Sequence, residues 1–110
     1  MIDDLYEKFL PQFVELSKTR MERIEAGAAK ADAASLTTAM RELHAIAGEA
    51  GLLGLAHLVP LARTAEEAAK HQRDARTEDN VAALGNALQE LRTALDAVVA
   101  AAGKPRGGSS

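Results

Sequence analysis

Apolar positions recur at spacings of three and four residues in four stretches of the chain, separated by short polar or glycine-containing breaks. This spacing is typical of an α-helix with one buried face. No stretch alternates apolar and polar residues with the period of two that marks a strand. The pattern therefore predicts an all-α protein, an antiparallel up-and-down four-helix bundle with a short or kinked N-terminal helix.

The first two predicted helices contain residues that typically bend, begin or end a helix. Pro11 is expected to kink the first helix or to divide it into a short and a long piece. The apolar period lapses near Gly27, which predicts a connection there. Asp32 or Ser35 can cap the second helix, and Gly54 is its natural stop in the left-handed conformation. The apolar positions expected in these two helices are Leu5, Phe9, Phe13, Leu16, Ile24, Leu36, Met40, Leu43, Ala47 and Ala50.

Two more helices follow. A third is expected over about residues 55–73, and Thr77 is a good cap for a fourth. Residues 103–110, GKPRGGSS, have no means of packing and are predicted to form a flexible tail, which leaves one bundle domain over residues 1–102. The expected inward positions are Leu58, Leu61 and Ala65 in the third helix and Val81, Leu84, Leu88, Leu91, Leu95, Val98 and Val99 in the fourth.

The composition of the chain excludes several kinds of functional site and partner. The 110 residues suit one domain, and 47% hydrophobic with 26% charged residues indicates a globular protein. The absence of cysteine excludes disulfides and thiolate zinc sites, and the net charge of -3 gives no general attraction for nucleic acid or anionic membranes. The acidic start MIDDLYEKFL lacks the basic region and apolar run of a signal peptide, so a cytoplasmic location is expected.

His44 lies at the border between the buried and the solvent-facing side of the second helix. On a helical wheel its neighbours are Thr37, Arg41, Gly48 and Gly51, none of which buries apolar surface. A residue four positions after a helical histidine sits against the imidazole, so a glycine at 48 gives a partner access to the ring. Helix stability alone would favour alanine there. The alternative reading is that the glycines mark a fraying helix end.

The run HAIAGEAGLLGLAHL, residues 44–58, resembles the signature of histidine-containing phosphotransfer (HPt) domains. That signature has His, an apolar residue at +2, Lys at +3, Gly at +4, Gly at +10, Leu at +14 and often Glu or Gln at +22. The resemblance covers residues 1 to about 102 and also agrees in helix count. The matching positions are His44, Ile46, Gly48, Gly54, Leu58 and Glu66, with a further glycine at Gly51 that is common in the family.

The resemblance implies that His44 is the phospho-acceptor and that Gly48 gives access to it. A phosphocarrier histidine needs one free, basic nitrogen and a second nitrogen that donates to an acceptor. His44 lies ten residues before Gly54 and Glu66 lies twelve after it, so the two can meet across antiparallel helices. Glu66 is therefore expected to accept from Nδ1 while Nε2 carries the phosphoryl group, with Glu67 as the alternative partner.

One position departs from the family: Ala47 stands where the signature has lysine. The compensating positive charge is then expected from Arg41, from Arg63 on the next helix, or from the receiver partner. Docking is expected on the surface around the histidine and on the exposed part of the N-terminal helix. The predicted partner-binding residues are Met40, Ala47, Gly51, Leu52, Leu5 and Phe9.

The resemblance implies a phosphocarrier without autokinase activity that shuttles a phosphoryl group between receiver-domain aspartates of a two-component phosphorelay. Its partners are then response-regulator receiver domains and a sensor or hybrid histidine kinase, the receiver holds the Mg²⁺, and the chain itself is a monomer with no cofactor or metal. His57 is expected to be structural or capping, and His71 solvated. Two alternatives stay open: a phospho-accepting domain served directly by a kinase, and a helical interaction or scaffold module without phosphate chemistry.

Overall fold

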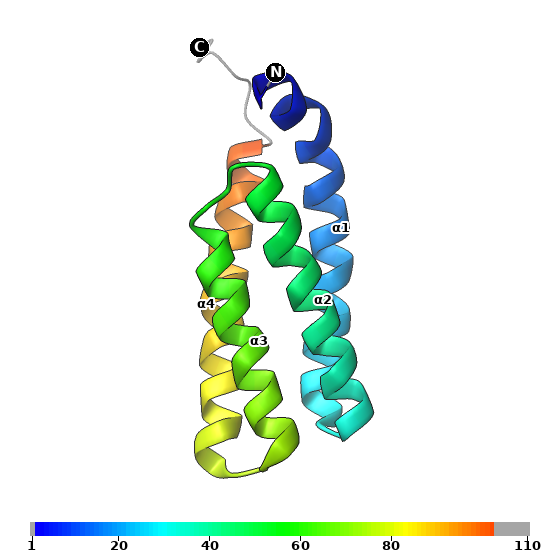
Figure 1. Cartoon of the computed structure of the whole chain (residues 1–110), viewed down its shortest axis with the longest axis vertical. Helices are drawn as coiled ribbons and strands as arrows, with labels where there is room; N and C mark the ends of the chain where they lie inside the picture. Colours follow the sequence, from blue (N-terminus) through cyan, green and yellow to red (C-terminus); the bar gives the residue numbers. More distant parts are fainter. Residues whose placement is uncertain (1, 103–110) are drawn as a thin grey trace.

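The structure is a computed structural model that describes the backbone of residues 2–102 and the side chains of residues 6–102. The described chain forms four helices and no strand: α1 (Ile2–Lys30), α2 (Ala33–Leu52), α3 (Leu58–Asp74) and α4 (Glu78–Ala102). They run up and down along one axis (Figure 1). The predicted all-α four-helix bundle is confirmed, while the tail predicted at 103–110 lies outside the described residues.

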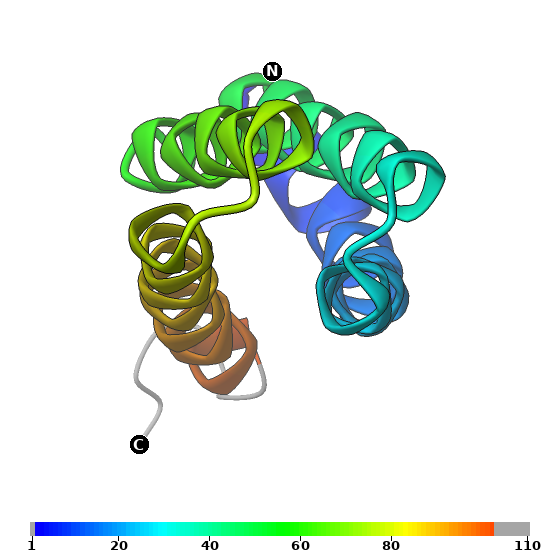
Figure 2. The same ribbon diagram turned by 90° about the horizontal axis from the view of Figure 1, so that it is seen from below.

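Seen along the bundle axis, α2 and α3 lie side by side, with α1 next to α2 and α4 next to α3 (Figure 2). The most extensive packing is between α2 and α3, and that between α1 and α4 is much smaller. The side of α3 that faces the core is mostly alanine, with Ala62, Ala65 and Ala69 fully buried. Small side chains let two helix backbones approach closely. The bundle therefore compensates for its shortage of aromatic residues by close contact of α2 with α3.

Pro11 was expected to kink α1 or to divide it, and the division does not occur. α1 continues through Pro11 as one helix of 29 residues, although its first turns lean away from the axis of the remainder in Figure 1. Proline removes one helical hydrogen bond, but Leu10 and Phe13 on either side of it are buried in the core and hold the helix together. Leu16 is 40% exposed and is not a core position. The buried face of α1 includes Val14 and Met21 instead.

The connection expected near Gly27 also lies elsewhere. α1 continues to Lys30, and Ala31 turns the chain with a φ of 61°. A Cβ atom at position 27 would lie 2.9 Å from the carbonyl oxygen of Ser35. Glycine at this position therefore serves the close approach of α1 to the start of α2, and it does not mark the end of a helix.

Of the two candidates, Asp32 is the N-cap of α2. Its Oδ1 accepts from the backbone N–H of Ser35 at 2.7 Å. At the other end Gly54 adopts a φ of +75°, as predicted for the stop of this helix. Its N–H donates to the carbonyl of Gly51 at 3.2 Å, and the N–H of Leu55 donates to that of Ala50 at 2.8 Å. This is the Schellman arrangement, which satisfies the last carbonyls of the helix and turns the chain sharply.

The start of α4 is also as predicted, because the Thr77 hydroxyl accepts from the backbone N–H of Asn80 at 3.1 Å. Val81, in the first turn of α4, is 42% exposed and was wrongly placed in the core. The other expected inward positions of α4 are buried or half-buried. None of the described helices is long and apolar enough to cross a membrane.

Candidate functional site

His44 projects from the middle of α2 with its side chain 77% exposed. Its Nδ1 lies 3.4 Å from Oε2 of Glu66, a half-buried side chain of α3. The two residues meet because the turn at Gly54 folds α3 back along α2, which is the meeting expected from counting outward from that glycine. With Nδ1 facing the carboxylate, Nε2 is the ring nitrogen that remains available on the solvent side of the helix pair.

The surface edge of the α2–α3 interface is here called the α2–α3 seam. Three contacts along it show which residues of α2 lie opposite which residues of α3. Arg73 donates from Nη1 to Oγ1 of Thr37 at 3.4 Å, and His44 meets Glu66. Farther along, a Cβ atom at Gly51 would contact Cγ2 of Val59 at 3.8 Å. From each pair to the next, the residue number rises by seven on α2 and falls by seven on α3. Seven residues are about two helical turns, so the three pairs repeat on one side of each helix.

Gly48 lies one turn beyond His44 and is exposed. A Cβ atom built at this position would meet nothing within 4 Å. No packing constraint requires glycine here, and glycine in a helix costs about 0.5–1 kcal/mol relative to alanine. The packing of the described fold therefore gives no reason for this glycine.

Three cations surround the His44–Glu66 pair. Arg41 lies one turn before His44 on α2, and Arg63 lies one turn before Glu66 on α3. Lys70, one turn after Glu66, is a third cation that the sequence analysis missed, although its spacing of four from Glu66 could have revealed it. All three are exposed, and none forms a hydrogen bond or an ion pair with another described residue.

The expected docking residues differ in their exposure. Gly51 is exposed and Leu52 is 84% exposed, while Met40 and Phe9 are half-buried. The side chain of Leu5 lies outside the described residues. Ala47 was wrong as a contact residue, since it is only 5% exposed. It lies four positions after Leu43 on the buried stripe of α2, so its methyl group faces the core.

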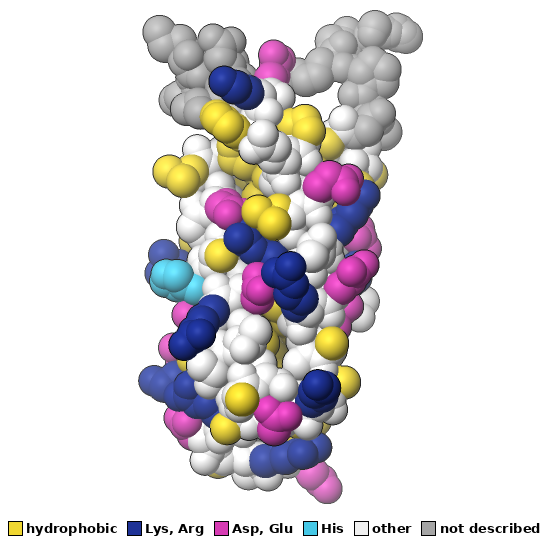
Figure 3. All heavy atoms as spheres, turned by 90° about the vertical axis from the view of Figure 1, so that its right-hand side faces the viewer, with side chains coloured by type: hydrophobic (Ala, Val, Ile, Leu, Met, Phe, Trp, Pro, Cys, Tyr) yellow, Lys and Arg dark blue, Asp and Glu magenta, His cyan; other side chains and the backbone are white. Residues whose placement is uncertain are grey.

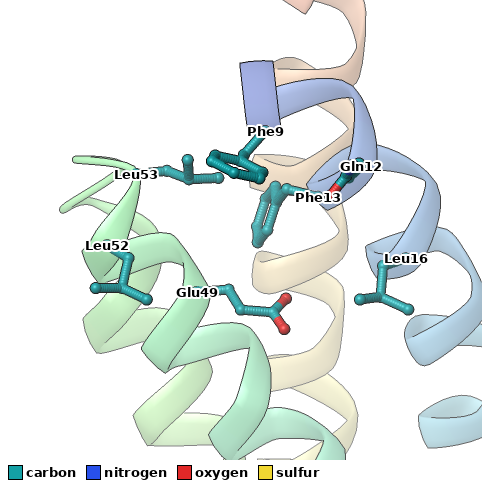
Figure 4. A pocket seen from close by; sticks show the side chains of 7 residues that line it. All are labelled: Phe9, Gln12, Phe13, Leu16, Glu49, Leu52 and Leu53. Atoms are coloured by element: carbon teal, nitrogen blue, oxygen red, sulfur yellow. The ribbon is translucent and has the colours of Figure 1, made fainter. Parts of the chain in front are cut away.

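An apolar hollow of about 370 Å³ lies between α1 and the last turn of α2. Figure 4 shows aromatic side chains of α1 on one side of it and the leucines that end α2 on the other. On the face over α1 and α2, hydrophobic side chains gather toward this end, and most of the charged ones lie farther along, among scattered hydrophobic and uncharged polar ones (Figure 3). The residues that line the hollow include Phe9, Phe13, Leu16, Glu49, Leu52 and Leu53.

The other histidines have different surroundings. His71 lies on α3 with Nε2 3.6 Å from Oε1 of Glu67 in the same helix, so its outer ring nitrogen is the one facing a carboxylate. His57 occupies the N-cap position of α3, but its side chain makes no capping hydrogen bond, contrary to the capping role considered above. Among residues 6–102, no cluster of three or more His, Cys, Asp or Glu side chains could hold a metal ion.

Comparison with known families decides the class of this site. Residues 8–101 match the family model described as the Hpt domain. The chain belongs to the Hpt family. Hpt domains are phosphocarriers of phosphorelays and interact with receiver domains and kinases, so the chain has a phosphotransfer role in such a relay.

One relative extends this comparison. The Hpt chain is 36% identical over 83 residues to a gliding motility regulatory protein of Myxococcus xanthus. The alignment covers 71% of this chain and 11% of that protein, so the chain spans only a small part of its relative's length. No solved structure matches the chain.

Proposed function

We propose that His44 accepts a phosphoryl group from the aspartyl phosphate of one receiver domain and passes it to the aspartate of another. The observation that carries this proposal is the exposed imidazole with Nδ1 at 3.4 Å from Glu66 and Nε2 on the open side. Membership in the Hpt family supports the reaction type. The open space at Gly48 supports access of a partner to the ring.

The chemistry follows from the tautomer that Glu66 favours. A carboxylate facing Nδ1 holds the proton on that nitrogen and leaves the lone pair of Nε2 free. This lone pair forms the N–P bond while the bond between phosphorus and the aspartyl oxygen breaks, and the carboxylate leaves with the electron pair. The ring then carries a positive charge that Glu66 balances. Attack by the second receiver's carboxylate on phosphorus returns the electron pair to Nε2 and restores the neutral imidazole.

The receiver partner completes the site. Phosphoryl transfer depends mainly on positioning and charge neutralisation, and we assign the Mg²⁺ and the acidic pocket to the receiver. Docking uses the open backbone at Gly48 and Gly51, the exposed Leu52, and the half-buried Met40 and Phe9. The apolar hollow beside Leu52 extends this surface toward α1 and offers it a place for an apolar side chain.

The test is phosphoryl transfer from a receiver domain labelled on its aspartate. The wild-type chain is expected to gain a label that is labile in acid and stable in base, as a phosphohistidine is, and then to lose it to a second, unlabelled receiver. His44→Gln is expected to gain no label. His71→Gln is the matched control, because it removes another exposed histidine that faces a glutamate and is expected to be labelled normally.

Each other outcome has a definite meaning. Label on a wild-type chain that persists in His44→Gln contradicts the assignment of the acceptor. A chain that is labelled by a histidine kinase with ATP, but by no phosphorylated receiver in a broad panel, is a domain served directly by a kinase. A folded chain that accepts label from neither source contradicts the proposed function and favours an interaction module.

A further inference from the structure

The register of the α2–α3 seam locates a replacement for the lysine that the HPt signature has at position 47. Three contacts fix that register: Thr37 with Arg73, His44 with Glu66, and Gly51 with Val59. Moving three residues from His44 toward the Gly54 turn reaches position 47 on α2. Moving three residues from Glu66 toward the same turn reaches position 63 on α3. The register therefore places Arg63 directly across the seam from Ala47.

The side chains at these two positions suit each other. Ala47 is buried and ends at its methyl group, so it leaves the edge of the seam uncovered. Arg63 is exposed and forms no ion pair or hydrogen bond with any other described residue. An arginine can lay its aliphatic stem along an apolar surface and keep its charged end in water. Its guanidinium is then free to approach a phosphoryl group on the neighbouring imidazole.

The other cations are less well placed for this role. Lys70 lies across the seam from Met40, whose longer, half-buried side chain occupies that position. Arg73 is already engaged, since it contacts Thr37 and forms an ion pair with Asp74 at 3.3 Å. Arg41 lies on the side of His44 away from position 47.

We propose that Arg63 supplies from α3 the positive charge that the HPt signature places at position 47 of α2, and that it stabilises the phosphoryl group on Nε2 of His44. This inference rests on the proposed function. The guanidinium offers two parallel N–H donors to phosphoryl oxygens, and these contacts strengthen as charge develops during transfer. Position 47 can therefore be a small core residue, which lets α3 pack closely on α2 without loss of the compensating charge.

The test measures the rate constant of transfer from a phosphorylated receiver at saturating receiver concentration. Arg63→Ala is expected to lower this rate constant by about tenfold, less than the loss of a buried donor because the site faces solvent. Arg76→Ala is the control: it removes one exposed cation just beyond the end of α3, ten residues from Glu66, and we expect a change of less than about threefold. Arg63→Lys is expected to retain most of the activity because it keeps the charge.

Rescue separates a charge effect from a structural one. Ala47→Lys in the Arg63→Ala background moves the cation across the seam and is expected to recover at least about half of the lost rate. Circular dichroism and thermal unfolding identify a double variant that fails to fold, in which case Arg63→Lys alone decides. Equal rates for Arg63→Ala and the wild type overturn the inference, as does an Arg63→Lys variant as slow as Arg63→Ala. A wild-type chain without label on His44 contradicts the proposed function instead, so the two failures are distinguishable.

Discussion

The cations on the two sides of α2 differ in whether a carboxylate is paired with them. On the side facing α1, Arg20 forms ion pairs with Glu42 at 3.2 Å and with Glu49 at 2.6 Å. Arg23 adds a second cation to Glu42 at 3.1 Å. The Arg20 and Glu42 side chains are only 16% and 17% exposed, so these charges are partly shielded from water. Every cation in this group has a carboxylate partner.

On the side facing α3, the only described carboxylate close to His44 faces the imidazole itself. Arg41, Arg63 and Lys70 lie around this pair, and none has an acidic partner among the described residues. Unpaired cations give a local positive potential that paired ones do not. The net charge of -3 therefore conceals three unpaired cations on the two helices that carry His44 and Glu66. The cations of Arg20 and Arg23 on the α1 side of α2 are therefore neutralised by carboxylates within the fold, whereas the three on the α3 side are not.

Gly48→Gln is expected to give the largest effect, because it covers the open side of His44 without disturbing the fold. Phosphoryl transfer is expected to fall by at least about a hundredfold, which corresponds to about 2.7 kcal/mol in the barrier. Thermal unfolding is expected to be unchanged or slightly higher, since a Cβ atom at 48 meets nothing within 4 Å. Gly85→Gln on α4 is the control, for the same open space surrounds that glycine far from the site. Normal transfer by Gly48→Gln contradicts the access argument.

Arg20→Met tests the opposite side of α2. The variant leaves two partly buried carboxylates without their cation and is expected to lower the free energy of unfolding by about 2 kcal/mol. Transfer through His44 is expected to stay within about twofold of the wild type, because no step involves this cluster. Lys18→Met is the control, since its pair with Glu15 is exposed and contributes little to stability. Urea unfolding measures both variants, and a loss of transfer without a loss of stability in Arg20→Met contradicts this prediction.

Glu66→Ala is expected to have a smaller effect on transfer, of about fivefold, because His44 loses the group that favours its reactive tautomer but keeps its accessible nitrogen. Glu66→Gln is expected to retain most of the rate, since an amide oxygen can also accept from Nδ1. Glu67→Ala removes the neighbouring glutamate, which faces His71. If Glu67→Ala slows transfer and Glu66→Ala does not, the alternative partner considered from the sequence is the correct one.

Asp32, the N-cap of α2, is expected to give the smallest effect. The backbone N–H of Ser35 donates to this carboxylate and lowers its pKa below 3.8. A folded-state pKa below the unfolded value means that the stabilisation is fully present above pH 3.8 and is lost as the pH falls through the lowered pKa. Asp32→Asn keeps a capping oxygen but cannot titrate. As the pH falls through the lowered pKa, the wild type is therefore expected to lose free energy of unfolding relative to Asp32→Asn. The free energy of unfolding of both proteins, measured at several pH values, tests this. A difference that does not change with pH contradicts the prediction.

Much of the fold followed from local spacing in the sequence. The helix count, the stop at Gly54 and the cap at Thr77 depend on contacts within a few residues of each other. The sequence left open whether Pro11 bends α1 or divides it, and the helix stays unbroken because flanking core contacts outweigh the hydrogen bond that proline removes. Gly27 was misread for a similar reason, since the carbonyl that it accommodates belongs to the next helix.

The sequence by itself determined that an exposed histidine stands on a helix beside a glycine, and counting outward from Gly54 already brought Glu66 to it. Only the tertiary structure decided that Ala47, which the sequence placed both on the apolar stripe and on the docking surface, belongs to the core, and that the contacts at Thr37, His44 and Gly51 share one register. The physical reason is that a helical period fixes which residues share a face of one helix, whereas the register and separation of two helices depend on the side chains packed between them. Here those side chains include the buried alanines of α3, which let it lie close to α2.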